Sequence, residues 1–196
     1  IDDSAVRLIE RRPVTIRLAR GMAPMPLPLE SDRPVLALGG HQKVAIAFSN
    51  GRQALLGPHL GDLDSPAMRK RFETHLREMI ELLGAEPELL VHDMHPDYHT
   101  TRWATSQGLA TFAVQHHHAH IVAGMLEHGW LDREVLGIAF DGTGYGPDGS
   151  VWGGEFLICT ANSCRRVAHL RPFRLLGGEA AIREPWRAAV SLLAET

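Results

Sequence analysis

A histidine-rich run in the middle of this sequence constrains the fold more than any other feature. Residues 110–114 are apolar enough to form a strand, and residues 116–120 (HHHAH) follow almost at once. His116 and His120 are four residues apart, so on a helix their imidazoles share one face and can bind the same metal ion. The run therefore predicts a strand that leads into a metal-binding helix.

A second predicted strand, over residues 135–140, leads to the carboxylate of Asp141 and then to a glycine-rich segment, residues 142–146 (GTGYG). Open α/β sheets bind their ligands at the carboxyl ends of neighbouring strands. We therefore expect Asp141 to join His116 and His120 as a third metal ligand, with the glycine-rich segment as a phosphate-binding loop. Two nitrogen ligands and one oxygen ligand suit zinc or ferrous iron with an open coordination position.

Each half of this pattern also has a simpler interpretation. Histidine pairs of this spacing occur by chance on solvated helices, and a histidine cluster can be the remnant of a tag, although this one is internal. Asp141-Gly142 is a strong turn signal, so on its own it also fits a hairpin turn. The occurrence of both halves together favours a shared active site.

The composition is that of one globular domain or a little more. Of the 196 residues 44% are hydrophobic, and the net charge is −3 without a basic run, so nucleic acid is not expected as the main partner. No segment reaches the roughly 18–20 apolar residues of a membrane span, so we expect no membrane partner. Cys159 and Cys164 cannot form a four-cysteine zinc site, and we expect them to be structural in a reducing, cytoplasmic location.

Both ends of the sequence look cut. It starts without a methionine, and it ends at Thr196 inside a predicted helix. We therefore expect a fragment whose partners include flanking lobes of the same protein. The apolar residues Val190, Leu192 and Leu193 are expected to lie exposed where such a lobe would pack.

Hydrophobic periodicity predicts alternating strands and helices. The expected strands are residues 13–20, 35–38, 43–48, 53–56, 89–92, 110–114, 135–140, 152–160 and 165–170, and the expected helices are 66–83, 100–107, 116–129 and 178–195. Asn50-Gly51 predicts a hairpin between two of these strands. Such an early hairpin, followed by alternating helices and strands, resembles one lobe of the actin-like and sugar-kinase-like (ribonuclease H-like) fold, an α/β lobe with a mixed sheet flanked by helices.

Residues 21–28 (GMAPMPLP) predict an extended linker outside any sheet, because proline has no amide hydrogen for a strand ladder. We place a domain boundary there, with residues 1–28 before it and residues 29–196 after it.

Seven motifs along nearly the whole chain resemble those of the HypF family of carbamoyltransferases. They are residues 38–43 (LGGHQK), 58–63 (PHLGDL), 92–98 (HDMHPDY), 101–104 (TRWA), 116–120 (HHHAH), 139–155 (AFDGTGYGPDGSVWGGE) and 177–187 (GGEAAIREPWR). Residues 1–24 resemble the end of the YrdC-like domain that comes before the transferase domain in this family. The resemblance implies that residues 1–28 are the tail of a YrdC-like α/β domain with its linker. Residues 29–196 would then be the N-terminal lobe of the carbamoyltransferase domain.

The resemblance implies a two-step reaction in the maturation of nickel–iron hydrogenases. Carbamoyl phosphate and ATP give carbamoyl-adenylate in the YrdC-like domain. The next domain transfers the carbamoyl group to the C-terminal cysteine of HypE. His116, His120 and Asp141 would hold a divalent metal ion, zinc or iron, which polarises the adenylate, and a fourth ligand would come from beyond Thr196.

The family pattern also implies contacts to phosphate. The amides of the glycine-rich segment would form an anion-binding nest for ATP or carbamoyl-adenylate, formed by Gly142, Thr143, Gly144, Tyr145 and Gly146. Lys43 matches a lysine of the family's hairpin and is expected to act with Asp141 in catalysis, through a charge contact to phosphate. The family pattern continues with Asn where this chain has Val44, and a solvated hairpin lysine is the alternative for Lys43. His117 and His118 are expected to face away from the metal, one of them as a supporting donor.

Other functions compete with this interpretation. An O-carbamoyltransferase of small-molecule biosynthesis shares the transferase domain, but its YrdC-like domain follows that domain, whereas here the YrdC-like tail comes first. The tRNA threonylcarbamoyl-transferring enzymes share the histidine pair but lack the segment 141–149 (DGTGYGPDG) and would need a basic face. A third alternative is a non-catalytic lobe that only binds metal or packs against other lobes.

Overall fold

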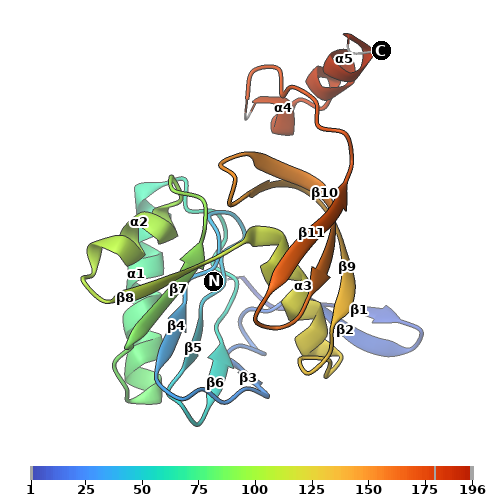
Figure 1. Ribbon diagram of the computed structural model, residues 1–196. Coiled ribbons are helices and arrows are strands. Elements are labelled where there is room, and N and C mark those ends of the chain that lie inside the picture. The colour runs from blue at the N-terminus through green and yellow to red at the C-terminus, as the bar shows by residue number, and fades with distance from the viewer. Residues whose placement is uncertain (1, 179, 195–196) are drawn as a thin grey trace. The chain divides into compact units, whose positions relative to one another are not determined.

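The computed structural model describes residues 2–178 and 180–194 and forms two compact units, residues 1–114 and 115–196 (Figure 1). We describe each unit by itself. No helix within the described residues has both the length and the apolar character needed to cross a membrane.

The first unit is built on a six-stranded mixed sheet with the order β3-β6-β5-β4-β7-β8. Its strands are β3 (Met25–Leu27), β4 (Val35–Ala37), β5 (Ala47–Ser49), β6 (Ala54–Leu56), β7 (Leu89–Asp93) and β8 (Ala110–Val114). The pairs β4–β7 and β7–β8 are parallel, and the other pairs are antiparallel. Two helices, α1 (Pro66–Leu83) and α2 (His99–Ser106), accompany this sheet, and β1 (Ala5–Ile9) pairs with β2 (Arg12–Arg17) in a separate hairpin.

Helix α1 shows how local sequence signals and core packing agree. The Ser65 hydroxyl accepts a hydrogen bond from the amide of Met68 at 3.2 Å, which caps the helix start, and Gly84 ends the helix in a left-handed conformation. Phe72, Leu76 and Met79 are buried on one face, where they pack with apolar side chains of β4, β5 and β7. The helix predicted over residues 66–83 is therefore confirmed.

The prediction that residues 21–28 stay outside any sheet is wrong for β3. Pro26 lies opposite Leu55 in an antiparallel pairing with β6. β3 is an edge strand, so one of its sides has no partner strand within the sheet. Pro26 can point its nitrogen, which has no hydrogen to donate, to that side, as prolines of edge strands do. The domain boundary predicted in this segment stays a prediction.

The N-terminal hairpin also differs from the prediction of a single strand over residues 13–20. Its turn consists of Glu10 and Arg11, both with positive φ, at 50° and 63°. Asn and Gly are the usual residues for such backbone angles. Neither occurs here, so the sequence gives no turn signal and β1 was not expected.

The second unit contains α3 (His116–Glu127) and a three-stranded antiparallel sheet with the order β11-β10-β9. Its strands are β9 (Val135–Tyr145), β10 (Val151–Cys159) and β11 (Cys164–His169), and two short helices follow, α4 (Ala180–Arg183) and α5 (Trp186–Ala194). Ile121 of α3 packs against a small core on β10 that includes Leu157 and Trp152. This packing sets α3 beside the sheet that carries Asp141.

Two predictions for this unit need correction. Strand β9 does not end at Phe140 but continues to Tyr145, because β10 keeps pairing with it as far as Tyr145 opposite Val151. The helix predicted over residues 178–195 is two helices, since Pro185 lacks the amide hydrogen that would join them. Glu179 and Glu195, which fall within that predicted helix, lie outside the described residues.

Candidate metal centre

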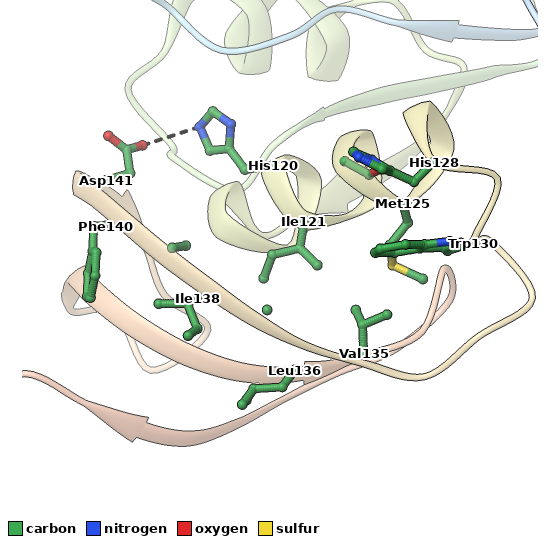
Figure 2. Close-up of a pocket in the computed structure, with 13 residues that line it drawn as sticks. His120, Ile121, Met125, His128, Trp130, Val135, Leu136, Ile138, Phe140 and Asp141 are labelled. Carbon is green, nitrogen blue, oxygen red and sulfur yellow. Dashed lines mark hydrogen bonds and ion pairs between the residues drawn. The ribbon is translucent and has the colours of Figure 1, made fainter. Parts of the chain in front are cut away.

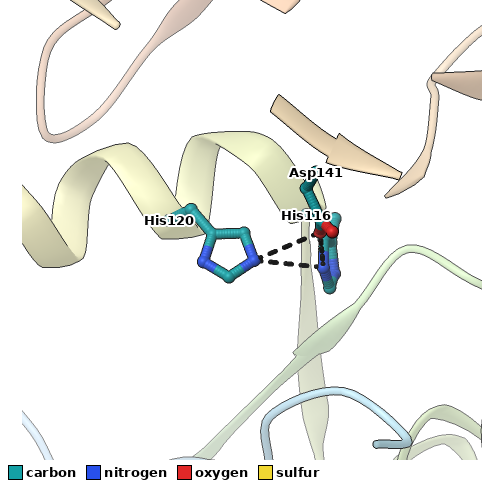
Figure 3. A group of neighbouring side chains, drawn as sticks. All are labelled: His116, His120 and Asp141. Atoms are coloured by element: carbon teal, nitrogen blue, oxygen red, sulfur yellow. Dashed lines mark hydrogen bonds and ion pairs between the residues drawn. The ribbon is translucent and has the colours of Figure 1, made fainter. Parts of the chain in front are cut away.

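The side chains of His116, His120 and Asp141 converge on one point (Figure 3). Asp141 Oδ2 lies 2.9 Å from His116 Nε2 and 3.3 Å from His120 Nε2, and the two imidazole nitrogens are 3.3 Å apart. All three candidate ligand atoms lie within 4.8 Å of one another. The spacing in the sequence predicts this convergence, and the structure shows it.

The local backbone structure orients the three side chains. Gln115 caps α3 by accepting a hydrogen bond from the amide of His118 at 2.9 Å, so the helix begins at His116 and places His120 one turn later. Asp141 lies within β9, where the amide of Gly142 donates to its Oδ1 at 2.8 Å. The other carboxylate oxygen, Oδ2, therefore faces the two histidines.

The donor set and its exposure fit a divalent metal ion. Two imidazole nitrogens and one carboxylate oxygen are a common catalytic ligand set for zinc and for non-haem iron. The side chain of His120 is 60% exposed and that of Asp141 is 41% exposed, whereas that of His116 is 23% exposed. One side of the cluster is thus open to solvent, which leaves room for a further ligand or a substrate.

His117 and His118 both lie away from this cluster's open side. His118 Nε2 is 2.9 Å from the backbone oxygen of Thr160, at the turn between β10 and β11. His117 is fully buried, and burial lowers the pKa of its imidazole. The expectation that neither residue faces the metal position agrees with these contacts.

The glycine-rich segment is part of a β-hairpin and not a loop after a strand. The amide of Gly146 donates to the backbone oxygen of Ser150 at 2.9 Å, and Gly144 lies opposite Trp152 in β10. Asp148 accepts hydrogen bonds from the Ser150 hydroxyl and amide and from the Trp152 indole, which lower the pKa of its carboxyl to about 2. These bonds fix the hairpin turn.

Two amides of the predicted anion nest, those of Gly142 and Gly146, are thus already hydrogen-bonded within the chain. The alternative of a hairpin turn at Asp141-Gly142 is wrong as well, because both residues lie within β9 and the turn comes after Tyr145. Phosphate binding by this segment, including Thr143 and Tyr145, stays a prediction.

Lys43 belongs to the first unit, residues 1–114. The sequence predicts it inside a strand over residues 43–48, but it lies before the observed strand. Strand β5 begins at Ala47, and Lys43 has a φ of 50° in the preceding turn. Its backbone amide donates to Asp62 Oδ1 at 2.8 Å, and the residue is exposed. Its contact to phosphate also stays a prediction.

Within the motifs of residues 92–98 and 177–187, several charged and polar side chains form local contacts. The amide of Asp97 donates to His95 Nδ1, and Asp97 forms an ion pair with Arg102, so these residues shape the turn after β7. Near the C-terminus, Arg187 Nε lies 2.7 Å from Glu184 Oε2.

An apolar groove that the sequence did not indicate runs from the metal cluster along α3 and β9 (Figure 2). It has a volume of about 550 Å³ and begins at His120 and Asp141. Apolar side chains line most of it, among them Ile121, Met125, Trp130, Val135, Ile138 and Phe140. Helix α3, strand β9 and the turn between them form this groove together, so no linear pattern could reveal it.

The comparisons with known proteins decide the family. The HypF Kae1-like domain matches residues 30–127, and the second subdomain of the carbamoyltransferase Kae1-like domain matches residues 137–196. The chain belongs to the HypF family. Its first domain match therefore includes α3, and the second includes most of β9 with Asp141.

Curated HypF proteins are similar over nearly the whole chain. Carbamoyltransferase HypF of Synechocystis sp. (strain ATCC 27184 / PCC 6803 / Kazusa) is 46% identical over 98% of this chain and 25% of its own length. Carbamoyltransferase HypF of Rhizobium leguminosarum bv. viciae is 40% identical, also over 98% of this chain and 25% of its own length. The chain thus spans about a quarter of the length of these relatives.

Solved HypF structures share the fold. A full-length HypF in the phosphate- and nucleotide-bound form matches 100% of this chain and 26% of its own, with a TM-score of 0.92 and 40% identity. HypF of T. kodakarensis matches 99% of this chain and 26% of its own, with a TM-score of 0.87 and 31% identity. The mixed sheet with its helices is therefore that of a Kae1-like HypF domain.

Proposed function

We propose that this chain supplies the metal-binding part of a carbamoyltransferase of nickel–iron hydrogenase maturation. In this proposal the enzyme makes carbamoyl-adenylate from carbamoyl phosphate and ATP and transfers the carbamoyl group to the C-terminal cysteine thiol of HypE. Relatives named carbamoyltransferase HypF support the transferase class. The convergence of His116, His120 and Asp141 is the observation that carries the proposal.

The contacts of the three ligands suggest how the site would work. A zinc or iron ion bound there would supply a Lewis acid for the carbamoyl carbonyl. Asp141 is oriented for binding because Gly142 holds its Oδ1, and its negative charge offsets part of the charge of a cation. The open side of the cluster, beside His120, leaves space for the carbamoyl group and the incoming thiol.

Further parts of the proposal lie outside the cluster. We propose that Lys43 and the hairpin residues Thr143 and Tyr145 approach the phosphate of the adenylate. We also propose that residues 1–28 end a YrdC-like domain, that the Kae1-like lobe is of the actin-like (ribonuclease H-like) class, and that the protein works in the cytoplasm. The early β5–β6 hairpin and the alternating elements that follow it support this lobe class.

Asp141→Asn in a full-length HypF protein that carries this segment tests the function. Asparagine keeps the shape of the side chain but removes the charge that helps to hold the metal. We expect loss of carbamoyl transfer to HypE, measured with labelled carbamoyl phosphate. Exchange of pyrophosphate into ATP that depends on carbamoyl phosphate should remain, because the YrdC-like domain performs that step.

Asp132→Asn is the matched control, since Asp132 is exposed in the turn before β9. It should keep both reactions. If Asp141→Asn abolished both reactions, the proposed division of labour between the two domains would be wrong. If it abolished neither, Asp141 would be only a structural residue of the hairpin.

A further inference from the structure

His117 lies between the two candidate metal ligands of α3 in sequence, but its surroundings are opposite to theirs. It is fully buried, whereas the side chain of His120 is 60% exposed. Its Nε2 atom is buried and makes no hydrogen bond of good geometry within the part of the chain that the structure describes, although the backbone of Asp141 is close enough to raise the pKa of its imidazole against the larger lowering by burial. A buried polar group of this kind is costly and calls for a reason.

The imidazole of His117 packs directly on the backbone of Gly144 in β9. A Cβ atom added to Gly144 would lie 2.6 Å from His117 Cε1, 2.9 Å from His117 Nδ1 and 2.9 Å from His116 Cβ. The backbone of Gly144 is not left-handed, so its conformation does not require glycine. The missing side chain instead allows α3 to approach β9 this closely.

Gln115 holds the imidazole of His117 in place. Its Oε1 accepts from the amide of His118, which fixes the orientation of the side-chain amide, so Nε2 is the atom that lies 3.1 Å from His117 Nδ1. The same Nε2 donates to the backbone oxygen of Tyr145 at 3.4 Å. Gln115 thus connects the histidine to the end of β9 beside Gly144.

This contact lies directly beside the metal cluster. His117 follows His116 directly in α3, and Gly144 lies shortly after Asp141 in β9. A change in how closely His117 and Gly144 pack therefore changes the separation of His116 Nε2 and Asp141 Oδ2, which is 2.9 Å. Metal affinity depends strongly on such supporting contacts.

We propose that His117 is a positioning residue for the metal centre and that Gly144 is the gap that receives its imidazole. The proposal rests on the metal site proposed above. It gives the missing side chain of Gly144 a packing role, and phosphate binding by the Gly144 amide stays a prediction.

A double-mutant cycle on this chain tests the proposal, with cobalt(II) affinity measured by competition with a chromophoric chelator and the cobalt absorption spectrum as a second readout. Gly144→Ala should weaken cobalt binding about tenfold or more and change the spectrum. His117→Ala removes two of the three close contacts to the new methyl group. In the double variant it should therefore restore part of the affinity that Gly144→Ala loses.

Gly153→Ala is the matched control. Gly153 lies in β10 of the same sheet, and its added Cβ would be 3.7 Å from the Gly142 backbone oxygen, an ordinary contact. This variant should bind cobalt as the unchanged chain does. Circular dichroism checks that each variant folds, and if Gly144→Ala does not fold, recovery of folding in the double variant supports the same contact.

Two results would overturn the proposal while leaving the metal site intact. The first is a Gly144→Ala variant whose cobalt affinity and absorption spectrum are unchanged. The second is a double variant whose fold-loss of cobalt affinity equals the product of the fold-losses of the two single variants. Failure of the unchanged chain to bind cobalt at all would instead overturn the proposed metal site, and the positioning role with it.

Discussion

His116 Nε2 and Asp141 Oδ2 lie 2.9 Å apart, although most of helix α3, a turn and half of strand β9 separate the two residues in the chain. The tertiary contact between α3 and β9 creates this pair, and His120 joins it from the next helical turn. The distances within the cluster therefore depend on how α3 packs against β9 in the second unit.

The stability of the first unit should depend on pH through His99. Burial lowers the pKa of His99, so the unfolded chain binds a proton at this residue at a higher pH than the folded chain does. The stabilisation is present above the unfolded pKa of about 6.5 and is lost as the pH falls from there toward the lowered folded pKa. Urea denaturation at about pH 7.5 and about pH 5.5 should show the loss.

His99→Gln should reduce this difference between the two pH values, whatever it does to stability at neutral pH. His169→Gln, a change at an exposed histidine of β11, is the control and should leave the difference as it is. An equal pH dependence in the unchanged chain and in His99→Gln would assign the effect to other groups.

The packing of α1 predicts a large loss of stability for Phe72→Ala. Phe72 is fully buried and makes edge-to-face contacts with His99 and Trp103, with ring centroids 5.9 and 6.0 Å apart. We expect a loss of about 3–5 kcal/mol in the free energy of unfolding. Leu82→Ala in the same helix, at a position that is 59% exposed, should cost less than about 0.5 kcal/mol. If urea denaturation gave similar losses of unfolding free energy for the two variants, this assignment of the core would be contradicted.

Helix α5 presents an apolar stripe to solvent, as the sequence predicted for Val190, Leu192 and Leu193. Trp186, Val190 and Leu193 share one helical face and are 58%, 46% and 76% exposed. Because exposed apolar stripes favour association, we expect this chain to self-associate as its concentration rises. Leu193→Lys should shift sedimentation velocity profiles toward monomer, whereas Asn162→Lys, which adds the same charge at the β10–β11 turn, should not. A monodisperse unchanged chain would contradict the expectation.

Local signals predicted a large part of the fold. The serine cap and the glycine stop fixed both ends of α1, Asn50-Gly51 marked the β5–β6 hairpin, and the helical spacing of His116 and His120 placed both imidazoles on one face. Each of these signals depends on residues that are close together in the sequence.

Two of the errors came where distant pairing decides the structure. Pro26 joins the sheet because β6 offers an edge, and β9 continues past Asp141 because β10 pairs with it. The contact of His117 with Gly144 depends on how α3 packs on that strand. No spacing within the chain encodes these three relationships, so the sequence alone did not predict them.

Metal content is the most direct test of the central claim, that His116, His120 and Asp141 bind one divalent ion. His120→Ala removes a ligand whose side chain is 60% exposed, so the fold should tolerate the change. His128→Ala is the matched control, because His128 lies just after α3, is exposed and bonds only to the backbone of Gly124 among the contacts described for its ring nitrogens.

The measurement is elemental analysis after equilibrium dialysis against zinc or ferrous iron. We predict about one equivalent per chain for the unchanged protein and for His128→Ala, and a clear loss for His120→Ala. Equal metal content in both variants, or none in the unchanged chain, would contradict the account.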